Sequence, residues 1–573
     1  MNAKTGLSLL ILIAAMGSVI VYVIGRTSMG DKRSDGHPDQ DAGLLPTIDF
    51  TILDEARSLD LIDTELEFPD SLKDLEGRRV RLIGFMAPFD NLQDMRRCMI
   101  VPSYVGCTFC SPPSFTQVVY VKQGSEDSGD RPYPFIEEPS HVTGTLRLSL
   151  PDSEHEGKQQ GFIYSMEDAT VTPYTGEAPE RAPGHGPTSG APTSHQQGTS
   201  LPSLETEELV QQIAEILGRE PRHPIEIEAV TIEAFGESVR EEVEATFPSA
   251  RALRTQAFSL LGMLPADADW VGTLAGAALT RRLAAADQRG ERILLLGGAP
   301  DDHPYVRLEL VGEITKAILR QHFAKRREGA GSDQPEGVVD MDDDARRAQE
   351  ALWLGIQTMV AYRYSRIQGI SPAAQAPAGV LPEEDVENLS AIEFDLWQSL
   401  PGDVGPFFVD YLVGATGPFS EVDVALDSPP GTTMQLFRPR WYQDPGQWRP
   451  DPVPADFADD ITDTPPNTTD VLGVGGLVPW LAKWYSVDVA KSLVGRWIGD
   501  RWAVWPFPDD SSGLVLEVRL RDEEAAIEFR KAIPKEPLQS IYPHQAGSHV
   551  VRLARASTAE ALARLVPTAQ DPP

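Results

Sequence analysis

The stretch from Leu7 to Ile24, LSLLILIAAMGSVIVYVI, constrains this chain most, because it is an uncharged apolar run long enough to cross a bilayer as a helix. A cleaved signal peptide is the alternative, but such a peptide usually has a shorter apolar core and a cleavage site between small residues. No cysteine follows the run closely, which excludes a lipoprotein anchor. We therefore predict an uncleaved transmembrane signal anchor over residues 7–25, after a short flank of residues 1–6.

The charges beside this anchor do not decide its orientation, because Lys4 on one side faces Arg26, Lys32 and Arg33 on the other. A short N-terminal flank followed by a large body is the usual layout of a signal anchor that leaves the body outside the cytoplasm. We therefore expect a single-pass protein of the cell membrane, with the membrane as a partner through the N-terminal helix and an extracytoplasmic body.

The charge balance of the body argues against a nucleic-acid partner. The chain has 50 Lys and Arg residues against 86 Asp and Glu residues, a formal net charge of -36. A field of this sign repels phosphate backbones. With 573 residues, of which 41% are hydrophobic, the chain has enough apolar material for packed cores and is too long for one core. At least two globular domains are expected.

Two polar segments divide the chain into these domains. Residues 26–46 are polar and lack hydrophobic periodicity, which predicts a stalk. Residues 175–203 are rich in Pro, Gly, Ser and Thr, a composition typical of a disordered linker. The predicted domains are therefore residues 47–174 and residues 204–565, followed by a short tail, residues 566–573.

The first domain has the pattern of a small β-barrel. Apolar and polar residues alternate in Arg79 to Met86, Val118 to Val121 and Val142 to Leu148, with turn residues between them. Five short strands, the first interrupted by a glycine, favour a closed barrel of the OB type.

The same domain resembles a known family. The runs LEGRRVRLIGFMAP, MIVPSYVGC, PPSFTQVVYV and HVTGTLRL, within residues 70–174, are similar to the bacterial domain of unknown function family 3299. That family typically carries Cys-x-His just before a proline run, which would place two metal ligands side by side. Here Cys107 matches the cysteine, Phe109 occupies the histidine position, and Cys110 follows at once.

The three cysteines, Cys98, Cys107 and Cys110, leave several chemistries open. A C-x-x-C pair can be half of a zinc site, a redox pair or a small disulfide, and Cys98 and His141 are the nearby candidates for partners. A disulfide or a buried thiol cluster is the first interpretation. Metal binding and thiol redox chemistry are the alternatives, although Pro112-Pro113 makes the helical context of a thioredoxin-like pair poor.

The second domain contains helical and strand patterns in an order typical of zinc metallopeptidases. Ser203 is a plausible cap for a helix from Leu204, a strand follows at Arg292 to Leu296, and a longer helix runs from Leu308 to Phe323. Within that helix, the run VGEITKAILRQHF from Val311 closely resembles the HELTHALQDQHF helix of a bacterial family of predicted zinc metallopeptidases. The resemblance implies a mainly α, zincin-type domain, so the chain as a whole is expected to be a multidomain α+β protein.

The resemblance also implies that the metal ligands have been lost. The two histidine positions fall on Gly312 and Lys316, the third ligand position falls on Leu354, and Glu313 matches the general base. Four further runs resemble the family pattern in the same order: Gly405 to Val409, Thr432 to Pro439, Gly495 to Arg501 and Glu523 to Phe529.

These substitutions leave no conventional zinc site. Catalytic zinc needs three protein ligands and an open fourth position, whereas glycine offers no ligand, leucine is apolar and lysine repels a dication. Because Lys316 lies three residues after Glu313 on one helix face, an ion pair can occupy the space of the metal. We expect no catalytic residue and no bound cofactor, with zinc as the alternative.

A zinc site rebuilt from His303, His322 and Glu309 is not expected, because His322 lies on the wrong helical turn relative to Glu313. A structural hydrogen bond is the expected role of His322.

The sequence therefore predicts a binding or scaffold protein with an inactive metallopeptidase-like domain and a peptide or protein partner. A degenerate peptidase keeps its substrate cleft more readily than its chemistry. The alternatives are a metal-handling or thiol-redox protein that acts through Cys107 and Cys110, and an active metallopeptidase with unorthodox ligands.

Overall fold

The computed structural model describes residues 45–174 and 203–566, apart from short gaps and the longer gaps 89–96, 102–117, 124–134, 149–162, 247–250, 324–341, 371–391 and 544–547. The predicted anchor over residues 7–25 lies outside the described residues. So do Cys107 and Cys110. Among the helices of the described part, none is both long and apolar enough to span a bilayer.

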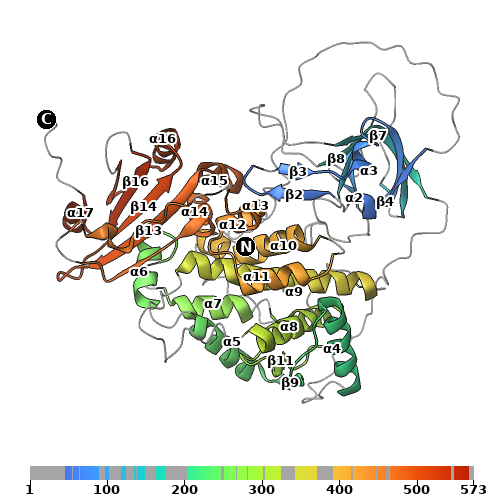
Figure 1. Ribbon diagram of the computed structural model, residues 1–573, viewed down its shortest axis with the longest axis horizontal. Helices are drawn as coiled ribbons and strands as arrows, with labels where there is room; N and C mark the ends of the chain where they lie inside the picture. The colour runs from blue at the N-terminus through green and yellow to red at the C-terminus, as the bar shows by residue number, and fades with distance from the viewer. Residues whose placement is uncertain are drawn as a thin grey trace, which may run out of the picture. The chain divides into compact units, whose positions relative to one another are not determined.

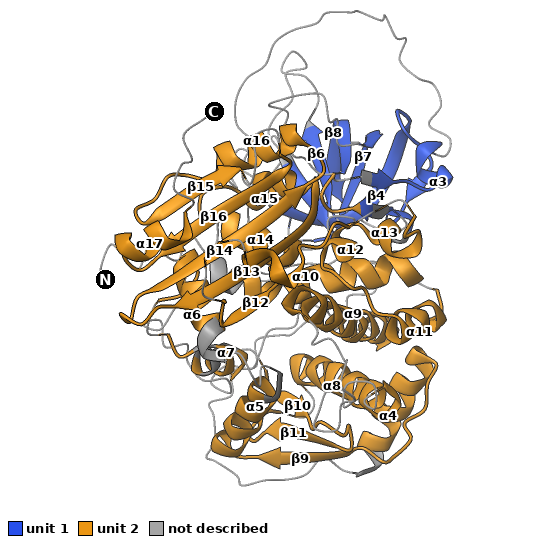
Figure 2. Cartoon of the chain, turned by 60° about the vertical axis from the view of Figure 1, so that its left-hand side comes forward, with its two compact units in different colours: residues 1–59, 64–188 blue, residues 60–63, 189–573 orange. Residues whose placement is uncertain are grey.

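The described chain divides into two compact units, drawn in different colours in Figure 2. The first consists of residues 1–59 and 64–188, and the second of residues 60–63 and 189–573. The boundary at residue 188 falls inside the predicted linker. The short insertion at residues 60–63 was not predicted from the sequence.

The first unit contains a closed five-stranded barrel. Its strands are β4 (Arg79–Pro88), β5 (Arg97–Val101), β6 (Val119–Gln123), β7 (Ser140–Leu148) and β8 (Tyr164–Pro173). They are hydrogen-bonded in the order β4-β5-β6-β8-β7, and β7 pairs again with β4, which closes the barrel (Figure 1). The pair β6 and β8 is parallel and the other barrel pairs are antiparallel. This is the OB-like arrangement that the sequence predicts.

The glycine in the first barrel strand marks the place where that strand changes partners. Residues Arg79 to Gly84 pair with β7, and Phe85 to Pro88 pair with β5. A β-carbon on Gly84 would lie 2.6 Å from Ile100 Cγ2 and 2.8 Å from the carbonyl oxygen of Val101. Glycine therefore allows the close approach of backbones at this corner of the barrel.

The second unit begins with helices around a small sheet. Its elements are α4 (Ser203–Leu217), β9 (Glu226–Val230), α5 (Ile232–Thr246), α6 (Arg251–Leu261), α7 (Trp270–Leu279), β10 (Ala284–Ala286), β11 (Arg292–Leu296) and α8 (Pro304–Phe323). The strands lie in the order β10-β11-β9. Helix α8 packs against this sheet and against α4 (Figure 1). The predicted strand at residues 292–296 is confirmed, and the predicted long helix begins four residues earlier than expected.

A longer helical layer follows along the chain. It consists of α9 (Asp343–Gln368), α10 (Ile392–Val413), α11 (Ser420–Asp427), α12 (Met434–Phe437), α13 (Pro439–Gln443), α14 (Gly473–Leu481) and α15 (Val487–Val494). Helix α9 packs along both α8 and α10. The positions that the sequence predicts for a degenerate metal site therefore lie on two neighbouring helices.

The C-terminal part of the second unit contains a five-stranded sheet, which the sequence analysis did not predict within the mainly α domain. The strands are β12 (Thr468–Asp470), β13 (Trp497–Pro506), β14 (Ser512–Leu520), β15 (Gln539–Pro543) and β16 (Val550–Ala556), accompanied by α16 (Glu523–Ala532) and α17 (Ala559–Leu565). Their order is β12-β13-β14-β16-β15, and every described pair is antiparallel (Figure 2).

This sheet is difficult to predict from the sequence because its central strands are buried on both faces. Trp502 and Leu514 face the main core, whereas Ala503, Trp505 and Val515 belong to a second core beneath α17. A strand buried on both faces has no alternation of apolar and polar residues, and alternation is the main local signal for a strand.

Candidate functional site

The positions of the predicted degenerate metal site lie on α8 and α9. Gly312, Glu313 and Lys316 are on α8, and Leu354 is on α9, which packs against it. A β-carbon on Gly312 would meet no atom within 4 Å, so this position has free space beside it. The structure therefore brings the predicted positions to one pair of packed helices.

Glu313 is buried, with 7% of its surface exposed, and both of its carboxylate oxygens have partners. The backbone N–H of Ala286 on β10 donates to Oε2 at 2.7 Å, and the guanidinium of Arg282 donates to Oε1 at 3.1 Å. Lys316 Nζ lies 3.2 Å from Oε2. Burial raises the pKa of Glu313, but Lys316 and Arg282 more than compensate and hold that pKa below its ordinary value. Glu313 is thus an ionised carboxylate fixed by three donors.

Glu242 on α5 joins the same group of charges. Its carboxylate lies 2.8 Å from Lys316 Nζ, 2.8 Å from Arg282 Nη1 and 2.9 Å from Arg320 Nη2. Burial opposes its ionisation, and the three cations hold its pKa well below the ordinary value. We refer to Glu242, Arg282, Glu313, Lys316 and Arg320 as the ion cluster.

The ion cluster connects four segments of the second unit. Arg320 also donates to the backbone carbonyl oxygens of Ala286 and Asp287, at 2.7 and 2.8 Å. Helix α8 is thereby attached to α5, to Arg282 just after α7, and to the end of β10. Because the side chains are between 5% and 24% exposed, these pairs are screened less than surface ion pairs.

Three donors already contact the carboxylate of Glu313, the residue that the resemblance places at the general-base position. A general base needs a free lone pair directed at a water or substrate, whereas Glu313 accepts from an amide, a guanidinium and an ammonium. A metal ion in the same place would meet the positive charges of Lys316 and Arg282. Within the described ranges, no group of three or more His, Cys, Asp or Glu side chains is arranged to hold a metal.

The other metal-ligand candidates on α8 and just before it have different surroundings. His322 Nε2 is 2.8 Å from the carbonyl oxygen of Glu220, which confirms its predicted structural hydrogen bond. His303 Nδ1 accepts from the backbone N–H of Tyr305 at 3.2 Å. Glu309 lies one turn before Glu313, and burial together with the negative charge of Glu313 raises the pKa of Glu309 to about 7.

A second buried network surrounds Asp344 at the start of α9 and Asp500 on β13. Asp500 accepts from the backbone N–H groups of Leu472 and Gly473, at 2.8 and 2.9 Å, and from the indole N–H of Trp497 at 3.0 Å. Burial raises the pKa of Asp500 to about 7, and the nearby Asp344 adds to this effect.

Asp344 is held by the segment that follows α11. It accepts from the backbone N–H of Thr433 at 3.0 Å and from the Thr433 hydroxyl, and burial raises the pKa of Asp344 to about 6. Gly473 lies beside it with a φ of +65°, and a β-carbon there would be 1.9 Å from Asp344 Oδ1. The runs around Thr433 and Asp500, which the sequence singled out, thus meet in one structural network. No local pattern indicated that Asp344 and Gly473 belong to it.

In the barrel, Cys98 and His141 are not brought together. Cys98 lies fully buried in the barrel core, and burial raises the pKa of its thiol to about 12. His141 lies between the buried residues Ser140 and Val142 on β7. Because successive side chains of a strand point to opposite faces, the His141 side chain is on the outer wall. A buried neutral thiol on the inside and an imidazole on the outside cannot share a metal ion.

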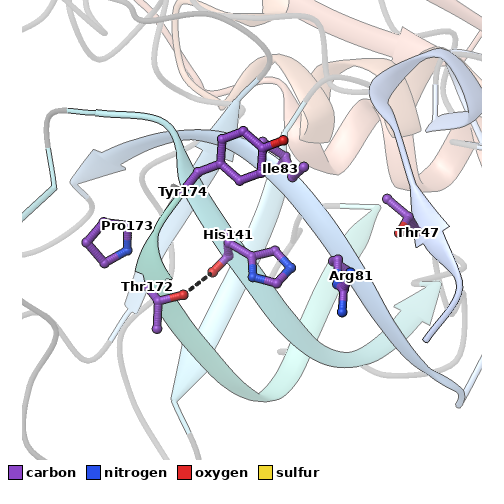
Figure 3. A pocket seen from close by; sticks show the side chains of 7 residues that line it. All are labelled: Thr47, Arg81, Ile83, His141, Thr172, Pro173 and Tyr174. Carbon is purple, nitrogen blue, oxygen red and sulfur yellow. Dashed lines mark hydrogen bonds between the residues drawn. The ribbon is translucent and has the colours of Figure 1, made fainter. Parts of the chain in front are cut away.

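The outer wall of the barrel contains a hollow of about 320 Å³, which the sequence did not indicate. Figure 3 shows the seven residues that line it: Thr47, Arg81, Ile83, His141, Thr172, Pro173 and Tyr174. All of them come from the first unit. Arg81 and His141 are the basic members of this lining.

Comparison with known proteins assigns a family to the region that contains the barrel. Residues 53–173 match the model of the family described as "Protein of unknown function (DUF3299)". A crystal structure of a DUF3299 family protein from Pseudomonas aeruginosa is 21% identical, and the match covers 24% of this chain and 100% of that chain, with a TM-score of 0.17. No curated protein matches the chain. The match to the family model identifies residues 53–173 of this chain as a DUF3299 domain.

Proposed function

We propose that residues 204–565 form a catalytically inactive metallopeptidase-like domain that acts by binding a peptide or protein partner. One observation carries this proposal: the face of α8 that corresponds to the metal-binding face of such enzymes is occupied by the ion cluster. Glu313, at the general-base position, is fixed by Ala286, Arg282 and Lys316.

The chemistry of the three ligand positions supports the same proposal. A zinc ion beside Glu313 would have to displace the Lys316 ammonium from two carboxylates, at 2.8 and 3.2 Å. Gly312 leaves space but offers no donor atom, and Leu354 has only an apolar side chain. Loss of all three ligands removes the activated water on which hydrolysis depends.

The cellular setting in this proposal rests on the sequence alone. The apolar run at residues 7–25 anchors the chain as a single-pass membrane protein, and the body lies outside the cytoplasm. A reporter enzyme that is active only after export, fused after Pro573, is expected to be active. An inactive fusion on a membrane-bound, full-length chain would overturn this topology.

Zinc binding and peptide binding test the binding role directly. The full-length chain with Cys107→Ser and Cys110→Ser, which removes the cysteine pair as a zinc source, is dialysed against zinc and its metal content is measured. The proposal expects less than about one tenth of an equivalent of zinc, because a catalytic site would hold one zinc ion per chain.

A labelled random peptide library is then incubated with the same protein, and retained peptides are identified by mass.

Retained peptides of unchanged length support the proposal. Stoichiometric zinc, or peptides that are shortened during incubation, would contradict it. The variant with Gly312→His, Lys316→His and Leu354→Glu supplies the matched comparison, because it restores the three ligand types at the aligned positions. Zinc uptake by this variant alone would support the alignment of α8 and α9 with the metal-binding helices of the peptidase family.

A further inference from the structure

The hollow on the outer wall of the barrel is built from residues that are direct neighbours in the sheet. Thr47 on β1 (Thr47–Ile48) is paired with Arg81 on β4, Ile83 on β4 is paired with His141 on β7, and His141 is paired with Thr172 on β8. Arg81 and Ile83 flank the fully buried Leu82, so both point outward. The register therefore gathers these side chains on one patch of the wall (Figure 3).

Two nitrogen atoms in this patch have no hydrogen-bond partner in the described part of the chain. Arg81 Nε and His141 Nε2 are both shielded from solvent, and neither has a hydrogen-bond partner among the described residues. A shielded polar nitrogen without a partner costs free energy, which is recovered when the side chain turns toward an acceptor group in the hollow. Both residues also line the same hollow, so one acceptor group inside it can approach both side chains.

The charge of the patch selects an anion. None of the seven described lining residues is acidic, although the chain has a formal net charge of -36. Burial lowers the pKa of His141, and the positive charge of Arg81 lowers it further. His141 is therefore neutral at pH 7, and the hollow presents one permanent positive charge, that of Arg81. One positive charge matches a monoanion such as a carboxylate better than a phosphate dianion.

The remaining lining gives the ligand an apolar side. Ile83, Pro173 and the ring of Tyr174 contribute apolar surface, and the hydroxyls of Thr47 and Thr172 stand on two edges. The Thr172 hydroxyl donates to the carbonyl oxygen of His141 at 3.5 Å, a long contact that leaves its lone pairs available. A volume of about 320 Å³ is at the small end of ligand pockets.

We propose that this hollow of the DUF3299 domain binds a small organic carboxylate with an apolar body. The carboxylate accepts hydrogen bonds from Arg81 and His141, and the apolar body lies against Ile83, Pro173 and Tyr174. The proposal concerns the first unit and does not depend on the function proposed for the second.

Titration of the full-length chain with benzoate and with hexanoate, followed by calorimetry or ligand-observed NMR, tests this site. One carboxylate is expected to bind per chain. Arg81→Gln is expected to weaken binding by roughly tenfold to a hundredfold, because it removes a charged hydrogen bond. Arg79→Gln is the matched control, since Arg79 lies two residues earlier on the same strand, has the same charge and does not line the hollow. This control is expected to bind as the parent does.

A second variant tests the cavity rather than the charge. Ile83→Phe keeps Arg81 and His141 and suits a β-strand, but it fills part of the hollow, so it is expected to abolish binding of benzoate while the protein stays folded. The proposal is overturned if neither carboxylate binds at millimolar concentration, if Arg79→Gln weakens binding as much as Arg81→Gln does, or if inorganic phosphate binds more tightly than both carboxylates.

Discussion

Lys316 Nζ lies 3.2 Å from Glu313 Oε2, one turn further along α8, and the same ammonium lies 2.8 Å from Glu242 Oε1 on α5. The lysine stands at the position of the second metal ligand in the peptidase resemblance. Its ammonium is paired with two carboxylates that belong to different helices. This face of α8 therefore contributes to the stability of the second unit.

Replacement of Glu313 by glutamine is expected to destabilise the second unit by about 3–5 kcal/mol, because it leaves Lys316 and Arg282 near a neutral side chain in a largely buried place. Unfolding in urea is followed by tryptophan fluorescence. All 10 tryptophans lie between residues 270 and 505, so this signal reports on the second unit.

The control for this variant is Glu228→Gln. Glu228 pairs with Arg292 at 3.6 Å, and both side chains are more than half exposed. Its replacement is expected to change the free energy of unfolding by less than about 1 kcal/mol. Equal stability of Glu313→Gln and the parent would show that the ion cluster does not hold α8.

Gly312→Ala is expected to stabilise the second unit by about 0.5–1 kcal/mol. A β-carbon there meets no atom within 4 Å, and alanine lowers the entropy that a glycine loses inside a helix. Gly355→Ala on α9 is the matched contrast, because its β-carbon would be 2.3 Å from the carbonyl oxygen of Gly405 on α10. Thermal unfolding of the two variants is expected to shift in opposite directions, and destabilisation by Gly312→Ala would contradict the free space at that position.

The raised pKa of Asp344 predicts that the free energy of unfolding depends on pH. Its pKa is raised from 3.8 to about 6 in the folded state by burial. Between about pH 4 and pH 6 the folded state therefore holds a proton that the unfolded chain has released, so the free energy of unfolding falls as the pH rises through this window. The loss is about 3 kcal/mol when complete. Asp500, with a pKa raised to about 7, extends the window upward.

The variant Asp344→Asn tests this assignment. An amide can still accept from the Thr433 N–H, but it has no charge to desolvate. Urea unfolding at pH 5 and pH 8 is expected to give a smaller difference for Asp344→Asn than for the parent, with the variant the more stable protein at pH 8. The exposed Asp459→Asn serves as the control. An unchanged pH profile in Asp344→Asn would assign the dependence to other groups.

Local patterns predict the barrel and part of the ion cluster. The alternation of apolar and polar residues in β4 and β7, with Gly84, predicted the barrel strands. The spacing of three residues between Glu313 and Lys316 predicted their ion pair. These features depend on neighbours in the sequence, or on a period of two residues, which a single chain displays directly.

The rest depends on distant residues. Glu242 lies 71 positions before Glu313, and Arg282 lies 31 positions before it, so no local spacing connects them. Arg81 and His141 meet only through the register of β4 with β7, in which a shift by one residue would separate them. The five-stranded sheet was missed because its central strands lack alternation. The membrane anchor stays a prediction.

Peptide cleavage with and without a zinc chelator tests the central claim most directly. The purified full-length chain and its Glu313→Gln variant are incubated with a quenched fluorescent peptide library, each with zinc and with 1,10-phenanthroline. The ion cluster predicts no chelator-sensitive cleavage by either protein, and so no difference between them. Cleavage by the parent that stops with the chelator and is absent in Glu313→Gln would contradict the account, because Glu313 would then be a working general base beside a bound metal.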